Sequence, residues 1–108
     1  MAEIFKSLII EVRDIVSASS TKVVDTIPLS NFQALEYSVA FYDSTGKSKT
    51  LKLFIRKDDV SLADQVYGKG GFPFNLAIGA FLNGSNAELR IQNLEPFPIN
   101  IKAARLII

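Results

Sequence analysis

The chain has 108 residues, of which 48% are hydrophobic and 21% are charged, and these proportions predict a globular protein and not a wholly disordered one. Twelve basic and eleven acidic residues leave a formal net charge of +1, so no strong field favours nucleic acid or an anionic membrane as a partner. The sequence contains no His and no Cys, the commonest general base, thiol nucleophile and transition-metal ligands, so we predict that the protein is not an enzyme and needs no cofactor or metal.

The N-terminal region carries no targeting segment that the sequence pattern reveals. Glu3, Lys6 and Glu11 interrupt its apolar residues, whereas a signal peptide needs an unbroken apolar stretch after a basic one. No apolar run in the chain approaches the roughly 20 residues of a membrane-spanning helix. We expect a soluble protein that is made in the cytoplasm and has no membrane partner.

Apolar and polar residues alternate with a period of two along much of the chain, most clearly at residues 35–41, 51–55 and 87–91. This period is typical of β-strands with one buried face. No segment keeps the period of a helix, although residues 30–34 could form a single turn. The pattern therefore predicts an all-β fold.

Turn-forming residues separate the alternating runs. Gly46 and the dipeptide Asn83 and Gly84 predict hairpin turns, residues 68–71 predict a flexible glycine loop, and residues 95–98 predict a stiff Pro-flanked connector. About eight strands lie between these turns, at residues 4–15, 22–28, 35–43, 49–56, 61–67, 74–82, 87–92 and 99–107. Short strands at this spacing predict one domain over residues 1–108, a single antiparallel β-sandwich.

The alternation also assigns the two faces of the strands. We expect the core to include the inward residues Tyr37, Val39, Leu53, Leu89 and Ile91. Phe54 falls on the outward face, in a row with Lys52 and Arg56, where a large apolar side chain is unusual.

Two sets of carboxylates are candidate sites. Three of them cluster near one predicted loop: Asp58, Asp59 and Asp64. They match no calcium-binding loop, so we expect a solvated loop. Glu36 and Glu88 occupy polar strand positions, and ion pairs with Lys52 or Arg90 explain them better than acid–base catalysis does.

Two further patterns suggest binding of phosphate or nucleic acid. Residues 68–71 lack the spacing and the following helix of a phosphate-binding loop. A set of basic residues interleaved with aromatic ones resembles a surface for single-stranded nucleic acid: Lys47, Lys49, Lys52, Arg56 and Lys57. Asp43, Asp58 and Asp59 lie nearby and offset much of this charge, so we expect no nucleic-acid partner.

Large apolar residues lie where small domains usually carry polar loops and tails. Eight Phe occur, several of them in or beside predicted loops, and both ends of the sequence are hydrophobic. Two interpretations stay open: these side chains fold back as lids on the core, or they form a surface for a partner or for another copy. The candidate interface residues are Phe5, Phe54, Phe72, Phe74 and Phe97.

Five stretches together follow a pattern known from a protein family. They are the Val-Asp-Thr-Ile run at residues 24–27, the strand at residues 32–43 that contains Tyr37, the segment at residues 64–68 that ends in Tyr-Gly, the strand at residues 86–91 and the closing strand at residues 99–107 that contains Arg105. Over residues 23–108 the chain resembles a β-sandwich module of tailed-bacteriophage virion proteins, particularly those of cyanophages. Residues 1–22 then form an N-terminal strand or arm.

The resemblance implies a structural protein located in the virion. The first interpretation is a capsid decoration or cement subunit, homo-oligomeric or in many copies, which contacts the major capsid protein or other virion proteins. The alternative is a neck, tail or baseplate component. A small carbohydrate-binding module for host attachment is the second alternative, against which the lack of Trp counts. The resemblance transfers no catalytic or ligand residue.

Overall fold

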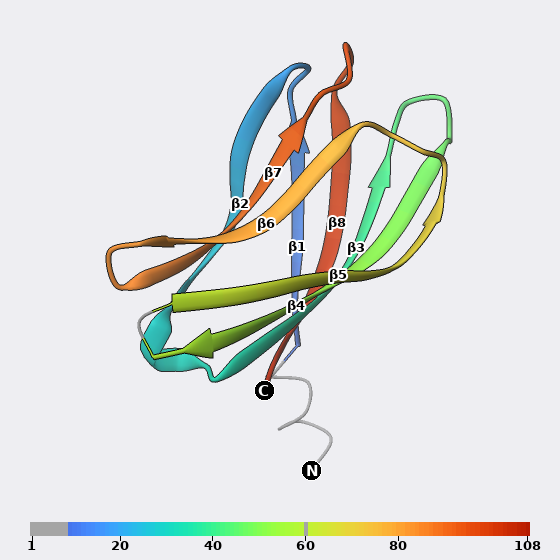
Figure 1. The fold of residues 1–108 in the computed structure, drawn as a ribbon. Coiled ribbons are helices and arrows are strands. Elements are labelled where there is room, and N and C mark those ends of the chain that lie inside the picture. Colours follow the sequence, from blue (N-terminus) through green and yellow to red (C-terminus); the bar gives the residue numbers. More distant parts are fainter. Residues whose placement is uncertain (1–8, 60) are drawn as a thin grey trace.

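The fold is an eight-stranded all-β structure, as the alternation predicts (Figure 1). The structure is a computed structural model, and it describes residues 9–59 and 61–108. The strands are β1 (Ile9–Val16), β2 (Ser20–Pro28), β3 (Ala34–Tyr42), β4 (Ser48–Asp58), β5 (Ser61–Gly71), β6 (Leu76–Asn83), β7 (Asn86–Asn93) and β8 (Ile99–Ile107). A short 3-10 helix, η1 (Leu29–Asn31), joins β2 to β3. The described residues contain no helix that is long and apolar enough to cross a membrane.

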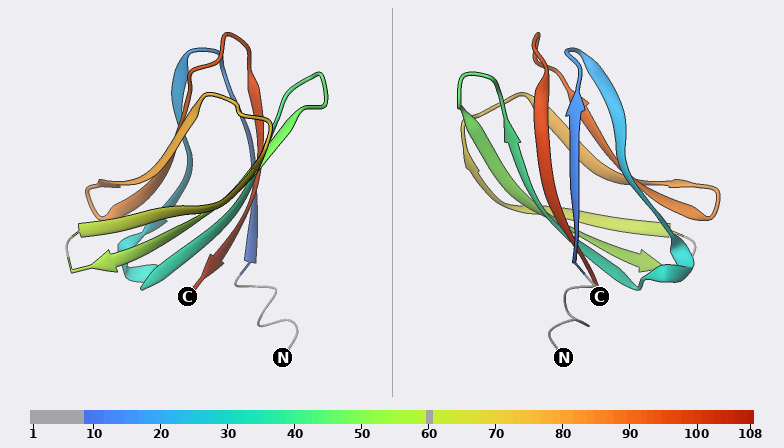
Figure 2. Two further views of the ribbon diagram at one scale, coloured as in Figure 1. Left: turned by 45° about the vertical axis from the view of Figure 1, so that its right-hand side comes forward. Right: turned by 180° about the vertical axis from the view of Figure 1, so that it is seen from behind.

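The strands form two antiparallel sheets that face each other. The larger sheet has the order β1-β8-β3-β4-β5, and the smaller one has the order β2-β7-β6. Figure 2 shows the two layers in a view turned by 45° and from behind. The chain changes sheet four times, between β1 and β2, β2 and β3, β5 and β6, and β7 and β8. The edge strands β1 and β2 line one open side of the sandwich, and the edge strands β5 and β6 line the other. The predicted antiparallel β-sandwich is therefore confirmed.

The core lies between the inner faces of the two sheets. All five core residues expected from the alternation are buried: Tyr37, Val39, Leu53, Leu89 and Ile91. Register explains this, because Tyr37 lies opposite Leu53, and residues that lie opposite each other in a sheet share one face. The period of two therefore assigned these side chains to the correct face.

The glycine-rich segment departs from the sequence-based expectation. Residues 68–71 do not form a free loop, because β5 continues through them to Gly71. The pairing of β5 with β4 shifts by one residue near Gly68, whose φ of +63° suits glycine. A residue without a side chain thus lengthens the edge strand through a β-bulge instead of ending it.

Candidate functional site

Three of the predicted interface residues lie together at one end of the sandwich. The ring centroids of Phe72 and Phe74 are 4.8 Å apart, and those of Phe74 and Phe97 are 6.1 Å apart. Phe72 and Phe74 follow β5, whereas Phe97 belongs to the connector between β7 and β8. We call this end, formed by residues 43–47, 72–75 and 94–98, the aromatic loop end; it lies at the top of Figure 1.

The backbone after β5 sets the direction of Phe72. Gly71 has a φ of +95°, and a Cβ at this position would collide with the carbonyl oxygen of Ser48. The N–H of Phe72 donates to the same oxygen at 2.7 Å. Gly71 therefore allows the chain to turn tightly against β4, which directs Phe72 toward the hairpin between β3 and β4.

That hairpin is held by one carboxylate. Asp43 Oδ1 accepts from the backbone N–H of Thr45 at 2.9 Å, from Thr45 Oγ1 at 2.7 Å and from the backbone N–H of Lys47 at 3.1 Å. The hydrogen bond from Thr45 is the largest cause of a lowered pKa for Asp43. The Nζ atom of Lys47 then lies 4.5 Å from the centre of the Phe72 ring.

A hollow of about 620 Å³ opens between this hairpin and the connector before β8. Its apolar lining includes Ile15, Phe72 and Phe97, and its polar lining includes Asp43 and Glu95. Phe72 and Phe97 are partly exposed, so their rings are available to a binding partner. Phe74 is only 3% exposed and belongs to the core, which corrects its assignment as an interface residue.

The position of Phe97 depends on a residue that the sequence analysis does not single out. Asn93 is fully buried, and its Nδ2 donates to the carbonyl oxygens of Val16 at 3.2 Å and of Phe97 at 2.8 Å. Its Oδ1 accepts from the N–H of Glu95 at 2.9 Å. The sequence does contain one signal for the burial of Asn93. Alternate residues of β7 point inward, and Asn93 takes the next inward position after Leu89 and Ile91.

We expect Asn93→Leu to loosen the aromatic loop end. The substitution leaves buried carbonyl and N–H groups without their amide partner, which costs about 1–3 kcal/mol for each group that stays unsatisfied. Hydrogen–deuterium exchange should show faster exchange at Glu95 and in the connector, together with a lower denaturation midpoint. Gln92→Leu, on the outward face of β7, is the control that should leave both unchanged. Unaltered exchange in Asn93→Leu would contradict this role.

The other two predicted interface residues lie elsewhere. Phe54 is half-buried on the outward face of β4, opposite Glu36 of β3 and Gln65 of β5. Phe5 lies outside the residues that the structure describes. The aromatic loop end therefore contains three residues of the predicted set, the partly exposed Phe72 and Phe97 and the buried Phe74, and it does not contain Phe54.

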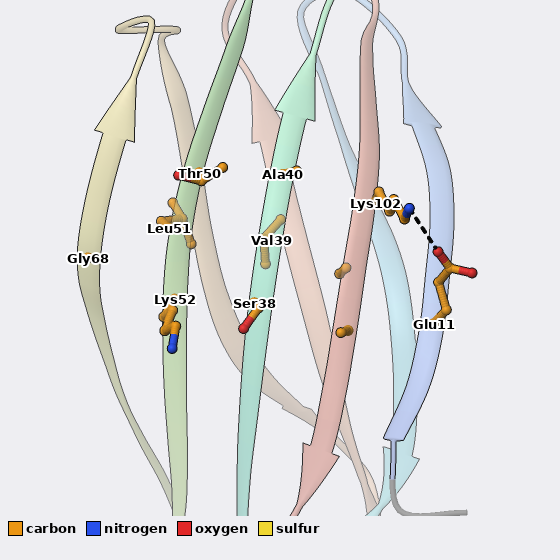
Figure 3. A pocket seen from close by; sticks show the side chains of 11 residues that line it. Glu11, Ser38, Val39, Ala40, Thr50, Leu51, Lys52, Gly68 and Lys102 are labelled. Atoms are coloured by element: carbon orange, nitrogen blue, oxygen red, sulfur yellow. Dashed lines mark ion pairs between the residues drawn. The ribbon is translucent and has the colours of Figure 1, made fainter. Parts of the chain in front are cut away.

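A second hollow of about 340 Å³ lies on the outer face of the larger sheet (Figure 3). Small residues on four neighbouring strands form it: Ser38, Ala40, Thr50, Gly68 and Ala104. Lys52 borders one side, and Glu11 and Lys102, whose charged atoms are 3.4 Å apart, border the other. We call this hollow the outer trough. It exists because each strand that crosses it places a small residue at the outward position there.

A polar cluster links the two sheets inside the sandwich. Asp25 Oδ2 of β2 accepts from Tyr37 Oη of β3 at 2.7 Å and from Arg105 Nη1 of β8 at 2.8 Å. The side chains of Arg105 and Asp25 are only 8% and 14% exposed. Burial, followed by the hydrogen bond to Asp25, raises the pKa of the Tyr37 hydroxyl far above its usual range. These three residues belong to the stretches that carry the virion-protein resemblance, and the structure gives them a role in holding the sheets together.

The carboxylates considered as catalytic or metal sites are separated in space. Glu36 on β3 accepts from Tyr67 Oη at 2.6 Å and lies 3.8 Å from Lys52 Nζ. Glu88 lies on β7 of the other sheet, 2.9 Å from Arg90, so both predicted ion pairs are confirmed. Among residues 9–59 and 61–108, no three His, Cys, Asp or Glu side chains gather closely enough to hold a metal ion.

The five basic residues interact with other groups of the chain. Lys57 Nζ donates to the carbonyl oxygen of Leu29 at 2.7 Å, and Lys49 Nζ donates to that of Phe74 at 3.4 Å. Arg56 pairs with Asp58 at 2.9 Å. Much of the positive charge along β4 is therefore engaged within the chain.

Comparisons with known proteins find no matching family model and no matching curated protein. The tailspike protein of Acinetobacter phage vB_ApiP_P1 is similar with a TM-score of 0.48 and 11% identity, covering 93% of this chain and 21% of that chain. The tailspike protein gp49 of Acinetobacter baumannii bacteriophage Fri1, described as a capsular polysaccharide depolymerase, is similar with a TM-score of 0.45 and 14% identity, covering 94% and 18%. The chain thus spans about a fifth of the length of either tailspike. Neither is described as a cyanophage module or as a capsid decoration protein.

One expectation is corrected by these comparisons. The prediction that the protein is not an enzyme is contradicted: one of the two similar tailspikes, of which the match covers 18%, is described as a capsular polysaccharide depolymerase. The absence of His and Cys was too narrow a reason, since a pair of carboxylates is sufficient for glycoside hydrolysis. At these identities and TM-scores the likeness assigns no activity to this chain.

Proposed function

We propose that the chain is a structural module of a tailed-bacteriophage virion, which attaches to a neighbouring virion protein through the aromatic loop end. The observation that carries this proposal is the hollow of about 620 Å³ lined by the partly exposed rings of Phe72 and Phe97. The sequence resemblance over residues 23–108 supplies the class of protein. The occupant is an apolar loop or terminal segment of a coat or tail protein.

The chemistry of the hollow supports an apolar contact. Its polar lining carries both signs of charge, with Asp43 and Glu95 opposed by Lys47, and the whole chain has a net charge of +1. Such a balance provides little electrostatic attraction over distance. Burial of one Phe side chain contributes roughly 1.5–3 kcal/mol. Many copies on one particle would make even a modest contact contribute collectively to the assembly.

The proposal also includes the position of the module on the particle. A capsid decoration or cement subunit is our first proposal, because a small sandwich with one apolar end suits a repeated shell. A neck, tail or baseplate component uses the same contact. The number of copies per particle separates the two, since a shell offers many equivalent sites and a ring offers few.

We expect Phe72→Ser and Phe97→Ser to reduce the occupancy of the chain on particles while the isolated domain stays folded. Occupancy is measured by quantitative gel after particles are separated from free protein. Phe81→Ser is the matched control, because Phe81 is an exposed Phe on β6, outside the aromatic loop end, and its loss should leave occupancy unchanged.

The same assay at two salt concentrations distinguishes apolar from ionic attachment. Occupancy should persist from about 0.1 M to about 1 M salt, where the screening length falls from about 10 Å to about 3 Å. Release by salt, with both Phe variants still bound, would contradict apolar docking and would favour a contact through the basic residues of β4.

A second candidate function follows from the outer trough. The hydroxyls of Ser38 and Thr50 and the charged groups of Lys52 and Lys102 are suited to the hydroxyl and acidic groups of a saccharide. This supports a carbohydrate-binding module for host attachment. Titration with a host-surface polysaccharide should shift the amide signals of Thr50 and Gly68 in NMR spectra, and unchanged signals at saturation would remove this candidate.

A further inference from the structure

The hollow of the aromatic loop end continues onto the outer face of the larger sheet. Ile15 and Asn100 line this hollow, and both also line a neighbouring hollow of about 510 Å³. Tyr42 and Arg13 belong to the lining of the second hollow alone. The two hollows therefore adjoin at Ile15 and Asn100, and together we call them the extended groove.

A row of outward residues forms the floor of the groove where the two hollows meet. Ile15 of β1 lies opposite Asn100 of β8, which in turn lies opposite Tyr42 of β3, so the three side chains share one face of the sheet. Asn100 Nδ2 donates to the carbonyl oxygen of Tyr42 at 3.4 Å. Ile15 is 55% exposed and Tyr42 is 39% exposed. Together with Phe72 and Phe97 they extend one exposed apolar surface from the loops onto the sheet.

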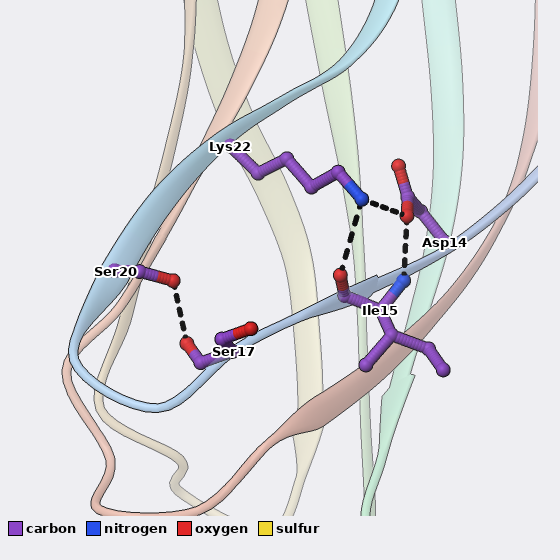
Figure 4. Close-up of polar contacts among 5 residues, drawn as sticks. All are labelled: Asp14, Ile15, Ser17, Ser20 and Lys22. Carbon is purple, nitrogen blue, oxygen red and sulfur yellow. Dashed lines mark hydrogen bonds and ion pairs between the residues drawn. The ribbon is translucent and has the colours of Figure 1, made fainter.

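Side-chain hydrogen bonds hold the part of β1 that carries Ile15 (Figure 4). Asp14 Oδ1 accepts from the N–H of Ile15 at 2.8 Å, and Lys22 Nζ donates to Asp14 Oδ1 at 2.6 Å and to the carbonyl oxygen of Ile15 at 3.5 Å. In the turn that follows, Ser20 Oγ donates to the carbonyl oxygen of Ser17 at 2.7 Å. Figure 4 shows that the side chain of Ile15 points away from Asp14 and Lys22. The backbone at Ile15 is thus fixed before a partner binds, which lowers the entropic cost of association.

The aromatic loop end of the extended groove carries an excess of negative charge. Two carboxylates, those of Asp43 and Glu95, line it together with the ammonium group of Lys47, whose Nζ lies 4.5 Å from the centre of the Phe72 ring. Glu95 is half-buried, and within residues 9–59 and 61–108 it forms no ion pair. A half-buried carboxylate of this kind is complementary to a partner that supplies a cation.

Arg13 gives the other end of the groove an excess of positive charge. Lys22 and Asp14 also line this end, but their charges offset each other in an ion pair of 2.6 Å. Arg13 pairs with Glu11 at 3.1 Å, and the two side chains are 64% and 50% exposed. Because exposed ion pairs contribute little free energy, the guanidinium can exchange Glu11 for a carboxylate of a partner.

We propose that the virion-protein segment bound at the aromatic loop end is extended and follows the groove onto the sheet. Its apolar residues cover Ile15 and Tyr42, a Lys or Arg of the segment lies beside Glu95, and an Asp or Glu lies beside Arg13. This inference rests on the proposed function and adds the chemistry of the partner. The opposite charges at the two ends allow one direction of the segment, because the reverse direction would place like charges together. They set direction and register more than strength, so the attachment still persists in salt.

The apolar part of the groove is tested with two isoleucines of the same strand. The purified chain is added to particles prepared without it, and a quantitative gel gives the concentration at half occupancy. Ile15→Ser should raise this concentration about tenfold, because the partner no longer buries the side chain. Ile10→Ser is the matched control, since Ile10 is 41% exposed on β1 and lines neither hollow. Circular dichroism confirms that both variants fold.

The charged ends are tested in the same assay. Arg13→Glu and Glu95→Lys should each raise the concentration at half occupancy several-fold, because each places like charges together. Arg56→Glu is the control for Arg13→Glu, since Arg56 is equally exposed and pairs with Asp58 at 2.9 Å. Asp58→Lys is the control for Glu95→Lys, because Asp58 lies at the end of β4 far from the hairpin of the aromatic loop end.

The outcomes separate this inference from the proposed function. If Phe72→Ser weakens binding but Ile15→Ser and Arg13→Glu do not, the partner segment does not follow the groove, and attachment through the aromatic loop end still stands. If Ile15→Ser weakens binding and neither charge variant does, or if the control Arg56→Glu weakens it equally, the charge order assigned to the segment is wrong. Unchanged binding of Phe72→Ser would contradict the proposed function itself.

Discussion

Asp25→Ala is expected to lower the free energy of unfolding by about 3–5 kcal/mol. The substitution leaves the guanidinium of Arg105 and the hydroxyl of Tyr37 buried between the sheets without the carboxylate that accepts from both. An uncompensated buried charge costs far more than the lost contact itself. A urea titration followed by circular dichroism measures the effect as a shift of the midpoint.

Two controls separate the buried pair from charge effects in general. Asp58→Ala breaks an exposed ion pair with Arg56 and should leave the midpoint nearly unchanged, because water solvates both groups. The double variant Asp25→Leu with Arg105→Met removes both charges and should recover much of the lost stability. If Asp25→Ala unfolds at the wild-type midpoint, the cluster does not hold the sheets together.

Leu53→Ala and Leu89→Ala are each expected to cost about 2–5 kcal/mol. Leu53 is 0% exposed and Leu89 is 2% exposed, and they lie in opposite sheets, so either truncation leaves a cavity in the core. A single substitution then removes a large part of a total stability that is typically about 5–15 kcal/mol. Urea midpoints again give the measurement.

The matched control for these two variants is an exposed leucine. Leu94 is 47% exposed just after β7, so Leu94→Ala should shift the midpoint little. Equal effects for Leu53, Leu89 and Leu94 would mean that burial does not determine the loss, and the inward assignment of the alternating residues would fail.

The strands could be predicted from the sequence because the period of two is a local property. The ranges expected for β3, β7 and β8 agree with the structure to within a residue or two, and the buried residues Tyr37 and Leu89 follow from parity alone. The order of strands in the sheets could not be predicted in this way. Pairing of β1 with β8 joins distant parts of the chain, and no local pattern specifies it.

The polar residues inside the sandwich were not identified for the same reason. Asp25 and Arg105 stand far apart in the sequence, and each alone resembles a surface residue, whereas parity assigned Tyr37 to the core without revealing its partners. Arg105 falls on the same inward face of β8 as Ile101 and Ala103, so its burial could be predicted from the sequence. The residue with which it pairs could not. Asn93 is a similar case, since its amide binds backbone groups that only the folded connector brings together.

The glycine-rich segment shows the limit of turn signals. Residues 68–71 predict a loop because glycine favours turns, yet they continue β5 through a bulge at Gly68 and a tight approach of Gly71 to Ser48. Glycine permits a close backbone contact as readily as it permits a turn. Whether these glycines form a loop or continue a strand therefore depended on the neighbouring strand β4, which the local sequence does not reveal.

The most direct test of the proposed virion role is a quantitative protein gel of purified virions of a phage whose genome carries this sequence. We expect the chain to remain with the particles after free protein is removed. On the order of hundreds of copies would identify a shell subunit, and a ring-sized number would identify a neck or tail component. Absence of the chain from purified particles would contradict the account.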